Sequence, residues 1–543
     1  MVPLFGKGVG LNFFSRRAFA TLCFAFWGVF ASAAAWAGPA DVPLHHWSYE
    51  AVDRLAAMGL CSSEGLSMRP FTRDWMASKI QEAIRTVEDK EVGVSPEQAS
   101  QVEEDLLRLS YEFAPELSAL GFSGSDEGGR QPGQPFQWKA FLFQTALMSE
   151  KIMTRFERNG STSLLENSEG FRLKEGFNGR VHAPSWMSVG DWFALTLDPS
   201  LRSQKNDRAD LDFEEASLKL AYSNLELKGG DLNFWWGPGY HGDLILTNNA
   251  RPLQAFSLRT RRSFELPWYL RVLGNWQVQL IGAHLEEKRS GPQEPLLAGL
   301  RIENSPHRRI SLALSQTVLF GGKGEKHEIS DFFAALDPTQ GGGEHELADH
   351  LFSGDIRCAL PEPVRWIRLG TGLEIYGEFF GEDTKGIYIP DLVSYLGGIL
   401  ITNLFTWPGL DFRFEGATLH HQAYEHFIYL SGYRFKEEFL GHHAGPDAED
   451  LFFRLSQRFS FDDKPFVVGI QFDRERHGVS GEPLSFEEVA LTKNEVQADL
   501  HCDFSKQMGV TLAYQFEDIN DFQGSSGINS KNHIVSLETS FRF

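Results

Sequence analysis

Two histidines close to a glutamate, His345 and His350 with Glu346, come nearest to a metal centre by residue type. A zinc-binding helix needs its histidines four residues apart, so that both point from one face. Here they are five apart, which directs them to different faces, and Gly343 just before them disfavours a stable helix. We interpret this segment as a solvated loop and predict no metal site in it.

Other residues with the right chemistry also lack the right spacing. The histidine pairs 420–421 and 442–443 are adjacent in sequence, and adjacent residues in a strand face opposite sides. The carboxylates of 447–450 suit calcium but lack the spacing of an EF-hand loop. The segment 121–125 ends on serine where a nucleophile elbow needs glycine. We therefore predict no catalytic residues and no cofactor, and a protein that is not an enzyme.

An aromatic and polar segment, 229–262, is the strongest candidate for binding a ligand. Tryptophan faces stack on the apolar faces of sugar rings, while asparagine and arginine side chains satisfy hydroxyls and carboxylates. The candidate polysaccharide-binding residues are Trp235, Trp236, Asn248, Asn249 and Arg251.

The same segment also has a purely structural interpretation. Gly237-Pro238-Gly239 is typical of a turn, and Trp235 and Trp236 would point to opposite faces of a strand. Asn248 and Asn249 would close a loop through side-chain-to-backbone hydrogen bonds. For each single residue we favour this interpretation, which leaves the segment a strand-turn-loop-strand corner.

The first 37 residues have the features of a secretory signal peptide. Lys7, Arg16 and Arg17 precede an apolar run, 18–35, and Ala35-Trp36-Ala37 fits a cleavage site. The adjacent arginines also resemble a twin-arginine signal, although an ordinary export signal explains them as well. The protein is therefore expected to be exported.

The chain is acidic, with a net charge of -22, or -25 once the three basic residues of the signal are removed. Phosphate binding needs a basic surface, so nucleic acid is excluded as a partner. The exported chain keeps three cysteines, Cys61, Cys358 and Cys502. At most one disulfide could form, and its pairing stays open.

After the signal, no apolar run reaches the roughly 18 residues of a membrane helix. Two classes remain: an exported soluble protein, or a transmembrane β-barrel whose hydrophobicity is hidden in alternation. The 45 phenylalanines, 13 tryptophans and 12 tyrosines favour the barrel, because barrels place aromatic residues in girdles at both membrane interfaces.

Residues 38–122 are predicted to form a small helical domain on the periplasmic side, or a plug. Ser48, Thr72 and Ser95 are each placed to cap a helix, and Pro115 is expected to end the third. The segments 41–59 and 69–73 also resemble one S-layer-homology module, which would bind a cell-wall polymer, but Asp74-Trp75 departs from its pattern.

A linker at 123–135 separates these helices from a region at 136–543 with a period of two. Residues 218–228 form a predicted hairpin about a Ser223-Asn224 turn, and further strands are expected at 410–418, 433–436 and 467–469.

The alternating faces of the predicted strands are apolar and charged, which suits lipid outside and a watery lumen inside, but also fits a soluble sandwich. The last strand ends on Phe543, as the recognition signal for the barrel-assembly machinery does. The length predicts about 16 to 20 strands. The segments 321–350, 442–450 and 524–532 are expected to be polar loops.

Three consecutive runs, 234–239, 242–246 and 248–252, resemble the signature of the Wzi-type capsule-assembly family. The layout of signal, helices, strands and terminal aromatic agrees with that family. The resemblance implies a mainly β fold, with a large antiparallel transmembrane barrel of about 18 strands in the bacterial outer membrane and a helical bundle at its periplasmic end. It also implies a non-enzymatic, lectin-like role in attaching capsular or extracellular polysaccharide.

Three other functions remain as alternatives. An outer-membrane porin would have an open lumen, a barrel tethered to the cell wall would act through residues 41–90, and an outer-membrane enzyme is disfavoured by the missing catalytic set. The expected partners are polysaccharide, outer-membrane lipid and the barrel-assembly machinery.

Overall fold

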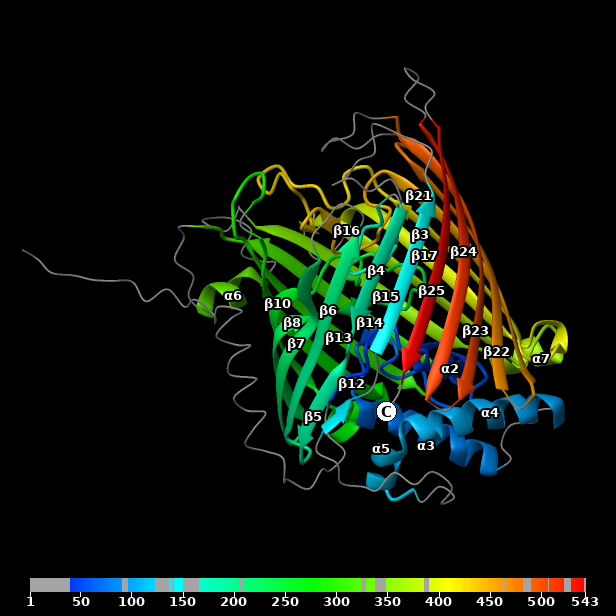
Figure 1. Ribbon diagram of the computed structural model, residues 1–543. Coiled ribbons are helices and arrows are strands. Elements are labelled where there is room, and N and C mark those ends of the chain that lie inside the picture. The colour runs from blue at the N-terminus through cyan, green and yellow to red at the C-terminus, as the bar shows by residue number, and fades with distance from the viewer. Residues whose placement is uncertain are drawn as a thin grey trace, which may run out of the picture.

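The chain forms a closed antiparallel β-barrel with a group of helices packed at one end, as seen in a computed structural model (Figure 1). The structure describes residues 40–89, 96–122, 136–138, 141–149, 166–174, 176–204, 209–286, 288–323, 329–336, 348–384, 390–462, 464–481, 490–505, 507–521 and 529–541. The predicted signal peptide, linker and terminal Phe543 lie outside the described residues, so those predictions stay open.

In the described residues the wall of the barrel consists of 21 strands in a closed order. They are β2 Phe136–Trp138, β3 Phe141–Ser149, β4 Gly176–His182, β5 Ser185–Val189, β6 Phe193–Gln204, β7 Asp210–Tyr222, β8 Leu225–Leu232, β10 Leu253–Thr260, β11 Phe264–Glu265, β12 Asn275–His284, β13 Leu296–His307, β14 Ile310–Phe320, β15 Asp349–Ala359, β16 Gly372–Thr384, β17 Pro390–Thr402, β18 Leu410–Leu419, β21 Ala448–Phe461, β22 Lys464–His477, β23 Leu491–Ser505, β24 Met508–Asp521 and β25 Asn529–Phe541.

Neighbouring strands in the wall pair antiparallel, and the last strand, β25, pairs with β3 to close the ring. In three places two short strands together occupy one position in the wall. Strands β4 and β5 both pair with β6, and β10 and β11 both pair with β12. The third couple, β2 and β3, pairs with the couple β5 and β4. Counting each of these couples once, the 21 described strands occupy 18 positions. This confirms the predicted barrel of about 18 strands.

The predicted hairpin at 218–228 is present as β7 and β8, joined at Ser223-Asn224, and it shows how the wall is oriented. Its leucines at 218, 220, 225 and 227 are exposed on the outside, whereas Lys219, Glu226 and Lys228 are buried inside. A soluble sandwich would bury the leucines and expose the charges. The inverted pattern is typical of a barrel surrounded by lipid.

The helices are α2 Ser48–Ala57, α3 Arg73–Glu88, α4 Pro96–Glu112, α5 Ala114–Ala119, α6 Ile329–Ala335 and α7 Pro361–Trp366, with 3-10 turns η1 Trp268–Leu273 and η3 Leu404–Thr406. The first four share a buried core that includes Leu55, Met76 and Leu109. None of the helices that the structure describes is long and apolar enough to cross a membrane.

Local sequence signals explain some of these helix boundaries. Ser48 does not cap α2 as predicted, because the residue before the helix is Trp47, whose side chain forms no capping hydrogen bond. The Thr72 side chain accepts the amide of Trp75 and caps α3, as predicted.

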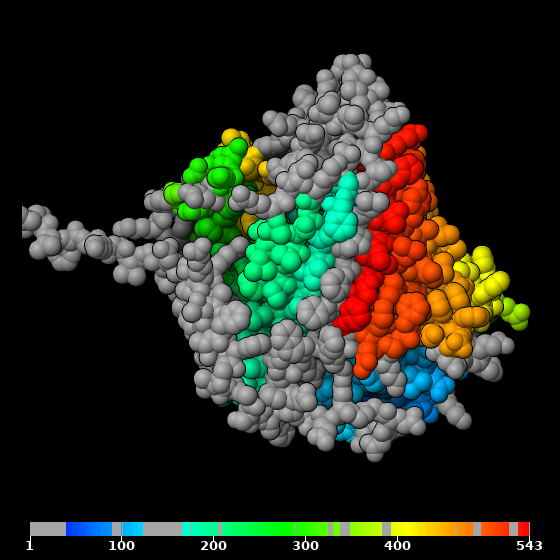
Figure 2. All heavy atoms as spheres, in the orientation of Figure 1, coloured from blue at the N-terminus to red at the C-terminus, as the bar shows by residue number. Residues whose placement is uncertain are grey.

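The third predicted helix, α4, ends at Glu112, just before Pro115, as expected. Pro115 then occupies the first turn of a new helix, α5, where its missing amide costs no hydrogen bond. In Figure 2 the helical segment, in blue, lies against one end of the strands.

The lumen is filled by two connecting segments that fold inward: 233–252, here called the plug segment, and 420–447, here called the lid loop. Together with side chains from the wall they form a large buried apolar core. Two predictions for the lid loop are corrected here. The alternation at 433–436 belongs to a small hairpin within the lid loop, β19 Arg434–Phe435 with β20 Glu438–Phe439, rather than to the wall. His442 is fully buried although a polar stretch was expected there.

Candidate functional site

The plug segment meets the N-terminal domain inside the barrel. Its short strand β9 Trp235–Trp236 pairs with β1 Met68–Arg69, which lies between α2 and α3. The amide of Gly237 also donates to the carbonyl of Ser67, at 2.9 Å. The two parts of the chain that fill the lumen therefore hold each other.

Both candidate tryptophans are buried at this junction. Trp236 is 0% exposed, and its indole Nε1 donates to the Gln279 Oε1 atom at 2.9 Å. Its backbone amide donates to the carbonyl of Leu246, also at 2.9 Å. Trp235 is 6% exposed. In this conformation neither ring offers a free face on which a sugar could stack, so their role in binding stays a prediction.

The turn after the tryptophans is held by a single wall carboxylate. Glu415 of β18 accepts the backbone amides of residues 240, 241 and 242, at 2.7–2.9 Å. Glycine is required at Gly239, because a Cβ atom there would lie 1.8 Å from the carbonyl oxygen of Gly242. The predicted turn is thus a tight corner fixed to the wall.

Asp243 follows this turn and is completely buried. Its Oδ1 atom accepts the amide of Gly239 at 3.0 Å, while Glu378 of β16 accepts the amide of Leu244 at 2.8 Å. Burial, reinforced by the neighbouring Glu378, raises the pKa of Asp243 well above its usual range. The carboxyl therefore favours its neutral form in the folded protein.

The three remaining candidates lie at the end of the plug segment. Asn249 is buried and its side chain donates to the carbonyl of Phe439 in the lid loop, at 3.2 Å. Asn248 is also buried. Arg251 contacts Asp212 at 3.1 Å, and its side chain is 31% exposed. Of the five candidates, Arg251 is the most accessible.

Sequence reasoning missed the lid loop as the partner of the plug segment. The Tyr424 hydroxyl donates to the carbonyl of Leu244 at 2.5 Å and accepts the amide of His442 at 3.0 Å. The amide of Thr247 donates to the carbonyl of Leu440 at 2.7 Å. The lid loop is rich in aromatic residues but lacks the regular alternation of a strand, and this pattern could have indicated that it is buried.

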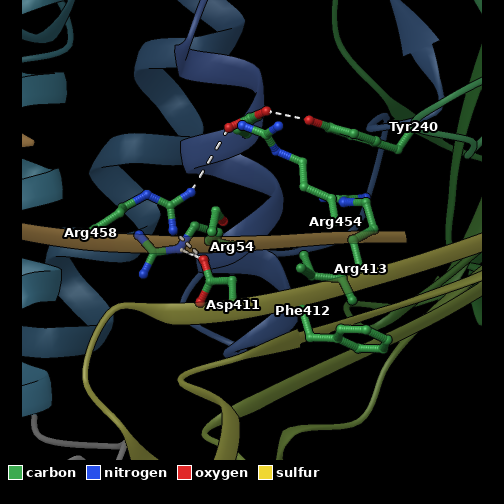
Figure 3. Close-up of a pocket in the computed structure, with 10 residues that line it drawn as sticks. Arg54, Tyr240, Asp411, Phe412, Arg413, Arg454 and Arg458 are labelled. Carbon is green, nitrogen blue, oxygen red and sulfur yellow. Dashed lines mark hydrogen bonds and ion pairs between the residues drawn. The ribbon is translucent and has the colours of Figure 1, made fainter. Parts of the chain in front are cut away.

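A small pocket of about 20 Å³ lies where α2 meets the wall (Figure 3). Figure 3 shows arginines from α2, β18 and β21 around it, together with Tyr240. The Arg413 guanidinium lies 4.1 Å from the centre of the Tyr240 ring. Carboxylates balance the other charges, since Arg54 pairs with Asp411 at 2.7 Å and Arg454 with Asp499 at 2.7 Å. The pocket thus joins helix and barrel through matched ion pairs.

A second ion-pair cluster lies at the start of the N-terminal domain. Asp41 is buried and pairs with Lys219, with Lys228 at 2.7 Å and with Arg259 at 3.1 Å. Burial alone would raise the pKa of this carboxyl, but the three cations lower it below its usual range. Asp41, which begins the first S-layer-like stretch, therefore contacts the barrel wall.

Among the remaining sequence candidates, His443 and Asp450 do come together, with His443 Nε2 3.4 Å from Asp450 Oδ2. His350 lies in β15 and pairs with Val318 of β14, while His345 is outside the described residues. The three cysteines of the described chain, Cys61, Cys358 and Cys502, are all free.

Comparison with known proteins agrees with this architecture. The family model described as capsule assembly protein Wzi matches residues 148–534. A Klebsiella pneumoniae protein, described as an uncharacterized 55.8 kDa protein in the cps region, is 29% identical over 218 residues. That match spans 39% of this chain and only 41% of the relative.

One solved structure is similar over almost its whole length. It is titled Wzi, an outer membrane protein involved in group 1 capsule assembly in Escherichia coli, a carbohydrate binding beta-barrel. It shares 17% identity with a TM-score of 0.65, covering 91% of this chain and 98% of that one. The likeness supports the fold. Because the family model covers more than half of the chain, the protein belongs to the Wzi family of capsule assembly proteins.

Proposed function

We propose that this protein attaches capsular or other extracellular polysaccharide to the cell surface, as a non-enzymatic, lectin-like barrel of the outer membrane. Membership of the capsule assembly family supports the biological role. The carbohydrate binding reported for the Escherichia coli structure supports the class of ligand. The apolar exterior of hairpins such as β7–β8 supports the membrane location.

The observation that carries the proposal is the filled lumen. A porin needs a continuous polar passage, yet the plug segment and lid loop bury Trp236, Leu244 and Tyr424 in one apolar core inside the barrel. Helix α2 contributes further contacts to wall strands at the other end. A barrel filled in this way suits a surface for holding a polymer better than a channel for solutes.

The lengths of the connections support an orientation with the helices on the periplasmic side. Outer-membrane barrels have short periplasmic turns and longer extracellular loops. The long segments 233–252 and 420–447 leave the end of the wall opposite to the short turn at Ser223-Asn224. Helix α2 contacts Asp411, at the beginning of β18, which lies at the short-turn end.

Arg251 is the residue of this segment that we assign to polysaccharide contact. It lies at the long-loop end, and its partly exposed guanidinium could bind a sugar carboxylate or hydroxyl. The other four candidates would act indirectly, by holding the corner of the plug segment that positions Arg251: Trp235, Trp236, Asn248 and Asn249.

Deletion of the gene in the source bacterium tests the proposal. We expect polysaccharide to move from the washed cells into the medium, measured as total carbohydrate in both fractions with capsule staining. Complementation with Arg251→Gln should restore retention only in part. Arg271→Gln is the matched control, because Arg271 has a 71% exposed side chain on η1 at the short-turn end.

Two outcomes would contradict the proposal. One is polysaccharide that stays with the cells after deletion. The other is a large, steady conductance of the purified protein in planar bilayers, which would identify a porin instead.

A further inference from the structure

The lumen contains a cluster of histidines and aspartates that no part of the proposed function uses. It is formed by His241 of the plug segment, His443 of the lid loop, Asp450 of β21 and Asp473 of β22, and is here called the His/Asp cluster. All four side chains are buried, with exposed fractions of 8%, 4%, 3% and 0%. Four separate parts of the chain thus meet at one point.

The polar atoms of the cluster face one another at unusual distances. The Nε2 atom of His241 lies 3.6 Å from Asp450 Oδ2 and 3.5 Å from Asp473 Oδ1. The Nε2 atom of His443 lies 3.4 Å from the same Asp450 oxygen. Good hydrogen bonds from nitrogen to oxygen are shorter, about 2.7–3.2 Å.

Neighbouring ligands around a tetrahedral ion are separated in just this range. Bonds of about 2.0–2.2 Å from zinc to nitrogen and oxygen place adjacent ligand atoms about 3.3–3.6 Å apart. Within the part of the chain that the structure describes, these atoms also have no hydrogen-bond partner: Nε2 of His241, both ring nitrogens of His443, Oδ1 of Asp450 and Oδ1 of Asp473. Buried polar atoms without partners are costly unless something else satisfies them.

The surrounding charges favour a cation. Glu475 and Glu495 lie beside the cluster, and Lys493 is bound among them, 2.9 Å from Glu475 Oε1 and 3.3 Å from Asp473 Oδ2. Further contacts fix the His241 ring, which stacks on Phe452 at 4.1 Å. The cluster is therefore rigid as well as acidic.

We infer that His241, His443, Asp450 and Asp473 bind one divalent transition-metal ion, of which Zn²⁺ is the best match to two imidazoles and two carboxylates. Two groups of side chains whose ligand atoms lie within 4.8 Å of one another overlap here: His241, Asp450 and Asp473 in one, and His442, His443 and Asp450 in the other. Such an ion would fasten the plug segment and the lid loop to the barrel wall.

We assign the ligand to His443 rather than to the neighbouring His442, whose Nε2 atom also lies 3.6 Å from Asp450 Oδ2. The Nδ1 atom of His442 accepts the backbone amide of Ala444 at 3.3 Å, which favours the tautomer with the proton on Nε2. A protonated nitrogen cannot bind a metal. This distinguishes the two adjacent histidines, and only His443 is left with both ring nitrogens available.

The test uses the full-length protein, folded in detergent, stripped with a chelator and then incubated with Zn²⁺. We expect about one ion per chain by elemental analysis. His241→Gln and His443→Gln should each weaken binding by at least about 10–100-fold, the range seen even for outer-shell partners. His421→Gln is the matched control, because it replaces a half-buried histidine of the lid loop outside the cluster.

Two measurements keep the test independent of misfolding. Heat-modifiable gel mobility shows whether each variant has formed its barrel. Separately, Co²⁺ bound to the unaltered protein should give a visible spectrum typical of nitrogen and oxygen ligands, without thiolate charge transfer. The inference is overturned if the stripped protein takes up no Zn²⁺ or Co²⁺, or if folded His241→Gln and His443→Gln variants bind Zn²⁺ as tightly as the control.

Discussion

The two ends of the barrel are closed by different kinds of contact. At the helix end, buried ion pairs connect the N-terminal domain to the wall, as Asp41 does with Lys228 and Arg259. At the loop end, the plug segment and lid loop bury apolar and aromatic side chains, such as Trp236 and Tyr424. Charges give direction and register to a docking domain, while apolar packing gives most of the free energy.

This difference follows from the wall itself. Where the wall meets the helices its inward face carries buried charges, such as Lys219 and Glu226, while its outward face is apolar. A domain that packs directly on that face needs charges of its own. The two inward-folding segments instead share an apolar core with inward-facing wall residues such as Ile281 and Phe380. Their backbone amides also donate to the wall carboxylates Glu415 and Glu378.

Replacement of Asp41 should have the largest effect. Asp41→Asn removes the carboxylate that three buried cations share and leaves them, among the described residues, only the carboxylates of Glu226 and Glu215 as partners. We expect this to destabilise the helix end by about 3 kcal/mol. Urea unfolding and trypsin cleavage of the N-terminal domain would measure this change. Because the pKa of Asp41 is lowered, its contribution should also be lost in the unaltered protein as pH falls through that lowered pKa.

Glu265→Gln is the control, since Glu265 has a 56% exposed side chain and pairs only with an exposed arginine among the described contacts. It should change stability by less than about 1 kcal/mol. Equal effects of the two substitutions would mean that the ion pairs do not hold the helix end.

Trp236→Phe tests the apolar end. The smaller ring leaves a gap and removes the hydrogen bond to Gln279, so we expect a loss of about 2–3 kcal/mol in unfolding free energy. Trp268→Phe is the control, because Trp268 is 85% exposed.

The double variant with Asp41→Asn sharpens the comparison. Independent ends should give effects that add to within about 0.5 kcal/mol. A larger interaction would show that the strand pair β1–β9 couples the two ends.

Asp243→Asn should have the smallest effect and the opposite sign. Since the pKa of Asp243 is raised, the folded state favours the protonated form, and stability is lost as pH rises from the usual carboxyl pKa of 3.8 through the raised value. An amide avoids that cost, so the variant should be more stable by about 1 kcal/mol at neutral pH.

Thermal melts at several pH values would measure this difference. Asp462→Asn, at an exposed turn, should follow the unaltered protein throughout. A variant of Asp243 that melts in parallel with the unaltered protein at every pH would contradict the raised pKa.

Much of the wall could be predicted from the sequence because its signals are local. The period of two in 218–228 and 410–418 identified real strands, and Thr72 marked a real helix start. The runs from Phe234 to Pro252 also indicated the family, which the match over residues 148–534 confirms.

Only the tertiary structure decided what each face meets. A period of two says that the faces of a strand differ, yet it does not say which one is inside. Contacts between distant segments determine three features of the interior: the burial of Trp235 and Trp236, the packing of the lid loop on the plug segment, and the approach of His241 to His443. The spacing of residues along the chain does not predict such contacts, because these segments come together only when the barrel closes.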